Sequence, residues 1–118
     1  MGRLFEEMFA QIRRMEFRRD GLRITEEQIA NFRAHVVPEF TAEEIAGKKV
    51  FDVDRRDGVK FLLENDAWVM MRPSGTEPLV RIYAEAETMP EVEELLAAAV
   101  KVVTEYALHY PKRYLKRR

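Results

Sequence analysis

The sequence contains no cysteine among its 118 residues, which excludes disulfides, thiolate metal sites and thiol catalysis. A chain without thiol chemistry suits a reducing compartment, so we expect a cytoplasmic protein. No apolar run is long enough to span a bilayer, and residues 1–9 mix Arg and Glu where a signal peptide would be apolar. We therefore expect a soluble, unexported protein with no membrane partner.

The sequence also lacks an excess of charge of either sign. Lys and Arg total 20 against 21 Asp and Glu, so net charge gives no general attraction to nucleic acid. Hydrophobic residues make up 47% and charged residues 35%, which is typical of a folded globular chain. We expect one domain over residues 1–118, with a helical lead-in (1–47), a sheet with a closing helix (48–110) and a basic tail (111–118).

Two helices are predicted in the first third of the chain. Residues 4–15 carry apolar side chains at three- and four-residue spacing, which is typical of an amphipathic helix. A second helix begins at a capping box formed by Thr25 and Gln28 and is expected to end just before Pro38. Residues 40–47 are expected to form a connection with one helical turn, because Thr41 and Glu44 repeat the capping pattern.

Four short β-prone segments and a long helix follow. The turn residues Asp57-Gly58 and Asn65-Asp66 lie between the first three segments. The expected strands are residues 49–54, 59–64, 67–72 and 80–87. A closing helix begins at a third capping box, Thr88 with Glu91. The predicted fold is α+β, with a four-stranded, mainly antiparallel sheet packed against helices and with two N-terminal helices.

The loop between the third and fourth predicted strands has the composition of a phosphate-binding site. It reads Arg72-Pro73-Ser74-Gly75-Thr76-Glu77-Pro78. A phosphate group is bound by a bidentate guanidinium, hydroxyl donors and converging backbone N–H groups, which Arg72, Ser74, Gly75 and Thr76 can supply. The two prolines would restrict the loop before binding, and Glu77 is expected to point away from the anion. By itself this composition also suits a wide hairpin turn.

The loop resembles the R-P-S-G-T-E-P signature of the α-D-phosphohexomutases, which include phosphoglucomutases and phosphomannomutases. The segments around it are similar to theirs as well, densely over residues 49–87 and more loosely in the helices. The resemblance implies the TBP-like C-terminal domain of these enzymes, which grips the phosphate that is not reacting. The implied site residues are Arg72, Ser74, Gly75 and Thr76, with Pro73, Glu77 and Pro78 shaping the loop.

The same resemblance implies a phosphoryl donor and a magnesium site that we expect to lie in other domains of the enzyme. In the family, a phosphoserine in the first domain transfers its phosphoryl group to the sugar phosphate, and aspartates of the second domain hold a magnesium ion. Ser74 is the only serine in this chain and lies inside the proposed anion loop. We therefore expect no catalytic residue, no bound cofactor and no mutase activity in this chain alone. The expected partners are a hexose phosphate or bisphosphate and the other domains of the same enzyme, and the hexose could be glucose, mannose or glucosamine.

Other interpretations of the sequence are weaker. The chain could be a stand-alone module that binds phosphorylated metabolites or a protein, or its basic tail with Tyr110 and Tyr114 could bind nucleic acid. The carboxylates Asp52, Asp54 and Asp57 fall at positions one, three and six before a glycine at seven, which does not match a calcium loop. His35 and His109 have no Cys or Asp at a ligand-like offset, so no metal site is predicted. Arg81 is expected to pair with a neighbouring glutamate and is not assigned to the site.

Overall fold

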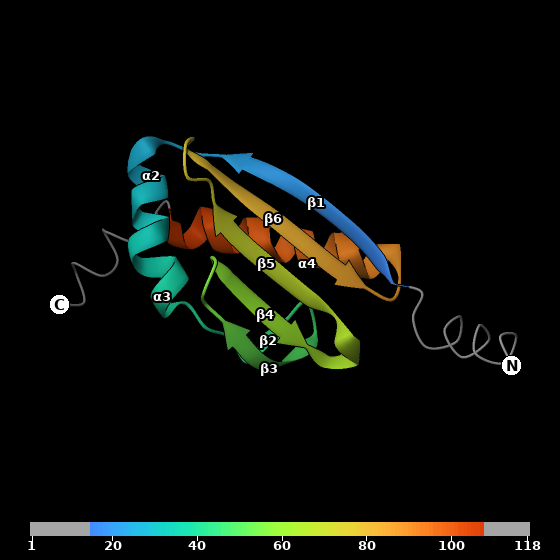
Figure 1. The fold of residues 1–118 in the computed structure, drawn as a ribbon. Coiled ribbons are helices and arrows are strands. Elements are labelled where there is room, and N and C mark those ends of the chain that lie inside the picture. Colours follow the sequence, from blue (N-terminus) through green and yellow to red (C-terminus); the bar gives the residue numbers. More distant parts are fainter. Residues whose placement is uncertain (1–14, 108–118) are drawn as a thin grey trace, which may run out of the picture.

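A computed structural model describes residues 15–107, which form one antiparallel sheet with helices packed on one of its faces (Figure 1). The strands lie in the order β1-β6-β5-β4-β3-β2. Their bounds are β1 (Glu16–Arg23), β2 (Glu44–Ile45), β3 (Lys48–Asp54), β4 (Val59–Leu63), β5 (Trp68–Pro73) and β6 (Leu79–Ala86). Residues 4–14 of the helix predicted over residues 4–15, and the basic tail, lie outside the described residues, and Met15 is not helical.

Besides a short 3₁₀ helix between β4 and β5 (Glu64–Asp66), two longer helical segments accompany the sheet. The first runs through α2 (Glu26–Asn31), a π-helical stretch (Phe32–Val36) and α3 (Val37–Glu39). The second is α4 (Met89–Val102), which continues as a π-helical stretch (Val103–Ala107). Two of the three predicted capping boxes are confirmed, at Thr25 and at Thr88. Pro38 lies inside the last helical turn and not beyond it, because the backbone widens into the π-helical stretch just before it.

The four predicted strands are confirmed within about a residue or two at each end. Strands β3 to β6 form a meander of successive antiparallel neighbours. Strand β6 buries every second residue, as its sequence pattern indicated, and these residues are Val80, Ile82, Ala84 and Ala86. They face α4, whose Val92 and Leu95 are fully buried.

The prediction of only four strands is wrong, because residues 16–23 form the edge strand β1. This strand pairs with β6 along its whole length, from Glu16 opposite Ala86 to Arg23 opposite Leu79. Seven of its eight residues are exposed, so it lacks the apolar alternation from which a strand is predicted. The 1–47 lead-in is therefore not purely helical.

The helical turn predicted within residues 40–47 is also wrong. Residues 44 and 45 form the short strand β2, which pairs antiparallel with the start of β3. Ala46 and Gly47 have φ angles of 53° and 78°, so the chain reverses through left-handed backbone before a helical turn can form. A capping pattern without an apolar helical stripe behind it was too little to specify a helix.

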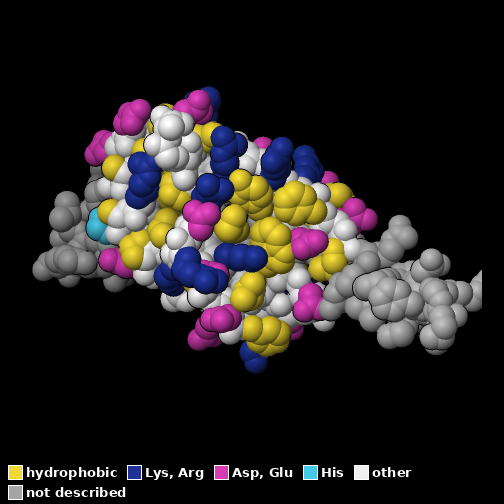
Figure 2. Space-filling view, in the orientation of Figure 1, with side chains coloured by type: hydrophobic (Ala, Val, Ile, Leu, Met, Phe, Trp, Pro, Cys, Tyr) yellow, Lys and Arg dark blue, Asp and Glu magenta, His cyan; other side chains and the backbone are white. Residues whose placement is uncertain are grey.

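Within residues 15–107 no helix covers the sheet face opposite α4, and a group of aromatic side chains lies on this face. Phe17 of β1 has its ring centroid 6.1 Å from that of Trp68 and 6.4 Å from that of Tyr83. Trp68 donates its indole N–H to Glu85 at 2.7 Å. Figure 2 shows hydrophobic side chains on this face with Lys and Arg around them. No helix within residues 15–107 is long and apolar enough to cross a membrane.

Candidate functional site

The predicted anion loop connects the ends of β5 and β6 at one end of the sheet (Figure 1). The two ends of the loop are joined by a hydrogen bond from Ser74 N–H to the Leu79 carbonyl at 2.8 Å. A second bond of 2.8 Å runs from Leu79 N–H to the Glu77 carbonyl inside the loop. The Pro78 carbonyl accepts the Ile24 N–H at 3.0 Å, which attaches the loop to the segment before α2. The loop is therefore a braced structure before any ligand binds.

Ser74 is the most buried residue of the loop, with only 9% of its surface exposed. Its Oγ accepts the backbone N–H groups of Thr76 and Glu77, each at 3.3 Å. The Thr76 amide, which the sequence predicts as a donor to phosphate, therefore donates within the loop instead. The hydroxyl hydrogen of Ser74 remains able to donate, because an oxygen that accepts two bonds still carries its own proton.

Arg72 lies on the open face of the sheet, directly opposite Arg81 in the register of β5 and β6. Directly opposed residues of antiparallel strands project from the same face with their Cβ atoms about 5 Å apart. Two guanidinium groups thus share one patch of surface beside the loop. No ion pair among residues 15–107 involves Arg81, so the expected pairing with a glutamate is not found there.

Asp57 is the acidic neighbour of this pair. Its Oδ1 lies 3.4 Å from Arg72 Nε, and both side chains are substantially exposed. It reaches Arg72 because Gly58 lies against the backbone of β5, where an added Cβ would be 2.9 Å from the Arg72 Cα. Gly58 has a φ of 89°, as predicted for this turn, whereas Asp57 does not take positive φ.

The turn that carries Asp57 is attached to the helical segment by Arg55. Its guanidinium donates to the carbonyl oxygens of Val37 and Phe40, both at 2.6 Å. These carbonyls belong to the carboxyl end of the helix, where acceptors have no partner inside the helix and a cation is favoured. The β3–β4 turn, the helix and the anion loop therefore form one connected site.

The remaining loop residues take different positions. Glu77 pairs with Arg23 of β1 at 3.4 Å, so its side chain is directed to the edge of the sheet. Gly75 is exposed, lies outside the left-handed region, and has no atom within 4 Å of a Cβ built on it. A turn that needs positive φ therefore does not explain the glycine at position 75. The open space above Gly75 would, however, let a ligand approach the backbone closely. Pro73 and Pro78 are half-buried at the two ends of the loop.

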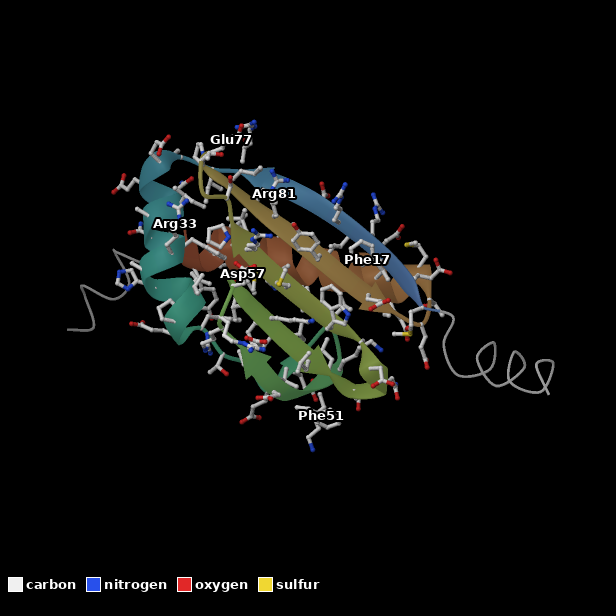
Figure 3. The ribbon with its side chains drawn as sticks, viewed as in Figure 1. Phe17, Arg33, Phe51, Asp57, Glu77 and Arg81 are labelled. Carbon is white, nitrogen blue, oxygen red and sulfur yellow. The ribbon has the colours of Figure 1, made fainter. Side chains whose placement is uncertain are left out.

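Arg33 is a further residue of the site, and it comes from the helix. Its guanidinium donates to the carbonyl oxygen of Ser74, 41 positions later in the sequence. Figure 3 shows Arg33, Asp57, Glu77 and Arg81 around the same end of the sheet. Arg81 could have been identified from the sequence, because the alternation in β6 places it on the solvent-exposed face of the strand. No local signal could have identified Arg33 or Arg23, because their contacts depend on long-range packing.

The carboxylates of the β3–β4 hairpin do not form a metal site. Asp54 accepts two hydrogen bonds from the Arg56 side chain, at 2.8 and 3.1 Å, and these bonds lower the pKa of Asp54 to about 2. Asp52 accepts the Val53 N–H at 2.8 Å. Among residues 15–107 no group of three or more His, Asp or Glu side chains could hold a metal ion. His109 lies outside the described residues.

Comparison with known proteins identifies the family. Residues 19–102 match the family described as phosphoglucomutase/phosphomannomutase, C-terminal domain. A phosphoglucomutase/phosphomannomutase of Thermococcus kodakarensis is 40% identical over 62 residues, which are 52% of this chain and 13% of that protein. A phosphoglucosamine mutase of Methanocaldococcus jannaschii is 49% identical over 49 residues, 42% of this chain and 11% of that protein.

A probable phosphoglucosamine mutase of Methanopyrus kandleri is 50% identical over 52 residues, covering 44% of this chain and 11% of that protein. The matched part of this chain thus corresponds to about an eighth of the length of these relatives. Each of these proteins is named as a mutase. The family match covers most of β1, the other five strands, the anion loop and α4. This chain therefore belongs to the phosphoglucomutase/phosphomannomutase C-terminal domain family.

Proposed function

We propose that this chain binds the phosphate group of a hexose phosphate or bisphosphate at the loop between β5 and β6. It would do so as the substrate-phosphate-binding domain of a larger enzyme that interconverts hexose 1- and 6-phosphates. The observation that carries the proposal is the cross-strand pair of Arg72 and Arg81, which gathers two guanidinium groups beside the braced loop. Arg72 supplies the planar, bidentate group that the sequence led us to expect.

The donors around this pair suit a phosphate dianion. Two guanidinium groups match its roughly two negative charges, and the Ser74 hydroxyl and the Thr76 side chain add neutral donors. Gly75 lies beneath open space and can bring its backbone N–H close to the anion. Because Ser74 Oγ already orders the loop amides, little conformational entropy remains to be lost when the ligand binds.

We expect the chain by itself to have no mutase activity. Its only serine is largely buried and its Oγ is engaged by two amides, which makes it a poor nucleophile and a poor phosphoryl donor. The described residues offer no donor set for magnesium, so no step of the proposal passes through a metal on this chain. A phosphoserine and Mg²⁺ would be supplied by other domains of the same enzyme.

Amide NMR of the 118-residue chain tests the binding proposal. Titration with glucose 1,6-bisphosphate should shift the amide resonances of residues 72–76 and of Arg81. Replacing Arg72 by Ala should weaken binding by about 1.5–3 kcal/mol, the usual value for a hydrogen bond to a charged group. Arg56→Ala is the matched control, since Arg56 is an exposed arginine paired with Asp54 on the neighbouring hairpin.

Two results would contradict this proposal. If the shifts cluster away from residues 72–81, or if the two arginine variants lose affinity equally, then binding at the loop is not specific. Turnover of glucose 1-phosphate in proportion to the concentration of the purified chain would contradict the expected inactivity. Loss of ligand binding on removal of the tail from residue 111, with no effect of Arg72→Ala, would favour a tail-based site instead.

A further inference from the structure

The Ser74 carbonyl is held by a side chain from another part of the fold. The Arg33 guanidinium, on the π-helical stretch that follows α2, donates to this oxygen. The backbone N–H of Ser74 is bound to Leu79, and its Oγ accepts two loop amides. The Ser74 N–H and Oγ are therefore engaged by the loop and by the start of β6, whereas the carbonyl has a partner from a helical segment far away in the sequence.

The Ser74 carbonyl and the Gly75 N–H belong to the same planar peptide group. In a trans peptide these two groups point in opposite directions, so fixing the carbonyl also fixes the N–H. The Gly75 N–H makes no hydrogen bond to residues 15–107, which leaves it free for a ligand. A peptide preceding glycine rotates easily, because glycine tolerates nearly all backbone angles. Without a restraint, this N–H would be directed to the anion only part of the time.

We propose that Arg33 is a positioning residue of the anion site, which directs the Gly75 N–H toward the phosphate by holding the Ser74 carbonyl. This inference rests on the proposed phosphate site. Two other contacts join the same segment to the loop: Ile24 N–H to the Pro78 carbonyl at 3.0 Å and Arg23 to Glu77 at 3.4 Å. Neither of them acts on the peptide between Ser74 and Gly75. Arg33 alone among the described side chains restrains that peptide from outside the loop.

The test compares Arg33→Met, Arg33→Lys and the charge-matched control Arg56→Met in the whole chain. The dissociation constant for inorganic phosphate should rise about tenfold in Arg33→Met, comparable with the loss of one ordinary hydrogen bond. Arg33→Lys should recover part of this loss, because an ammonium group can still donate to a carbonyl. Arg56→Met should bind phosphate as the unmodified chain does. The urea midpoints of the variants would show that all of them are folded.

A second measurement separates positioning from direct contact with the anion. In the ligand-free Arg33→Met variant, the Gly75 amide resonance should shift or broaden, and phosphate should no longer move it. If that resonance is unchanged while affinity falls and the salt dependence weakens, Arg33 binds the anion directly and the inference is overturned. Unchanged affinity and unchanged Gly75 resonance overturn it as well.

The outcome also distinguishes this inference from the proposed function. If the unmodified chain does not bind phosphate or glucose 1,6-bisphosphate at the loop, the proposed function fails, and positioning for phosphate fails with it. If the unmodified chain binds phosphate and Arg72→Ala binds it more weakly, but Arg33→Met leaves both the affinity and the Gly75 resonance unchanged, only the role of Arg33 is wrong.

Discussion

Asp57 Oδ1 lies 3.4 Å from Arg72 Nε, so a carboxylate forms an ion pair with the arginine that we propose binds phosphate. A phosphate dianion at Arg72 would be repelled by this carboxylate and would compete with it for the guanidinium. We predict that Asp57→Asn tightens phosphate binding about two- to fivefold, in keeping with the modest energy of an exposed ion pair. Isothermal titration at low salt measures this change.

The gain from Asp57→Asn should shrink at about 1 M salt, where the screening length is only about 3 Å. Asp54→Asn is the control, because this carboxylate pairs with Arg56 and not with Arg72. Weaker binding by Asp57→Asn would instead mean that Asp57 orients the arginine for the ligand, and the competition described above would be wrong.

Three glycines provide a graded test of backbone strain. Gly58 has a φ of 89° and an added Cβ would clash with the backbone of Met71 and Arg72, so Gly58→Ala should destabilise the fold by about 2 kcal/mol or more. Gly47 has a φ of 78° but open space around it, so Gly47→Ala should cost about 1 kcal/mol.

Gly75→Ala is the matched comparison within this series. Gly75 has neither positive φ nor a close neighbour, so its substitution should change stability by no more than about 0.5 kcal/mol. The new methyl group should nevertheless weaken phosphate binding, because it projects into the space that we assign to the ligand. Urea unfolding gives the order of the three variants, and equal stability losses would show that the Gly58 contact has no consequence.

Acid stability should depend on the Asp54–Arg56 pair. The hydrogen bonds from Arg56 lower the pKa of Asp54 to about 2, below the value of about 3.9 expected in the unfolded chain. The unfolded state therefore binds this proton first as pH falls, so the pair stabilises the fold above about pH 4 and loses its effect toward pH 2.

This dependence is measurable as the difference in urea midpoint between the unmodified chain and Asp54→Asn. The difference should be present at pH 6 and vanish near pH 2. It should also be absent at pH 6 when both proteins carry Arg56→Met, since the arginine is the principal cause of the lowered pKa. A difference that persists in the Arg56→Met background would assign the effect to another contact of Asp54.

The cap of α4 should contribute measurably to stability. The Thr88 hydroxyl accepts the Glu91 N–H at 3.3 Å, and the Glu91 carboxylate accepts the Thr88 N–H at 3.2 Å. Thr88→Ala should therefore cost about 1 kcal/mol. Thr104→Ala provides the comparison, because Thr104 donates only to the Lys101 carbonyl within the helix. Similar losses in the two variants would argue against a special contribution from the cap.

Sequence by itself determined those parts of this protein that depend on short-range pattern. The capping residues Thr25 and Thr88 start helices where the local sequence indicates, since each cap is satisfied within three residues. The strands β3 to β6 follow from alternation and turn residues. The composition of the loop alone indicates donors for an anion.

Tertiary structure decided what depends on register and long-range packing. Strand β1 is a strand because β6 supplies its hydrogen-bond partners, although its own side chains are mostly exposed. Arg81 joins the site because the loop length places it opposite Arg72. Arg33 reaches Ser74 only because the helix packs beside the end of the sheet. Local patterns specify donors, but convergence on one point in space is a property of the assembled fold.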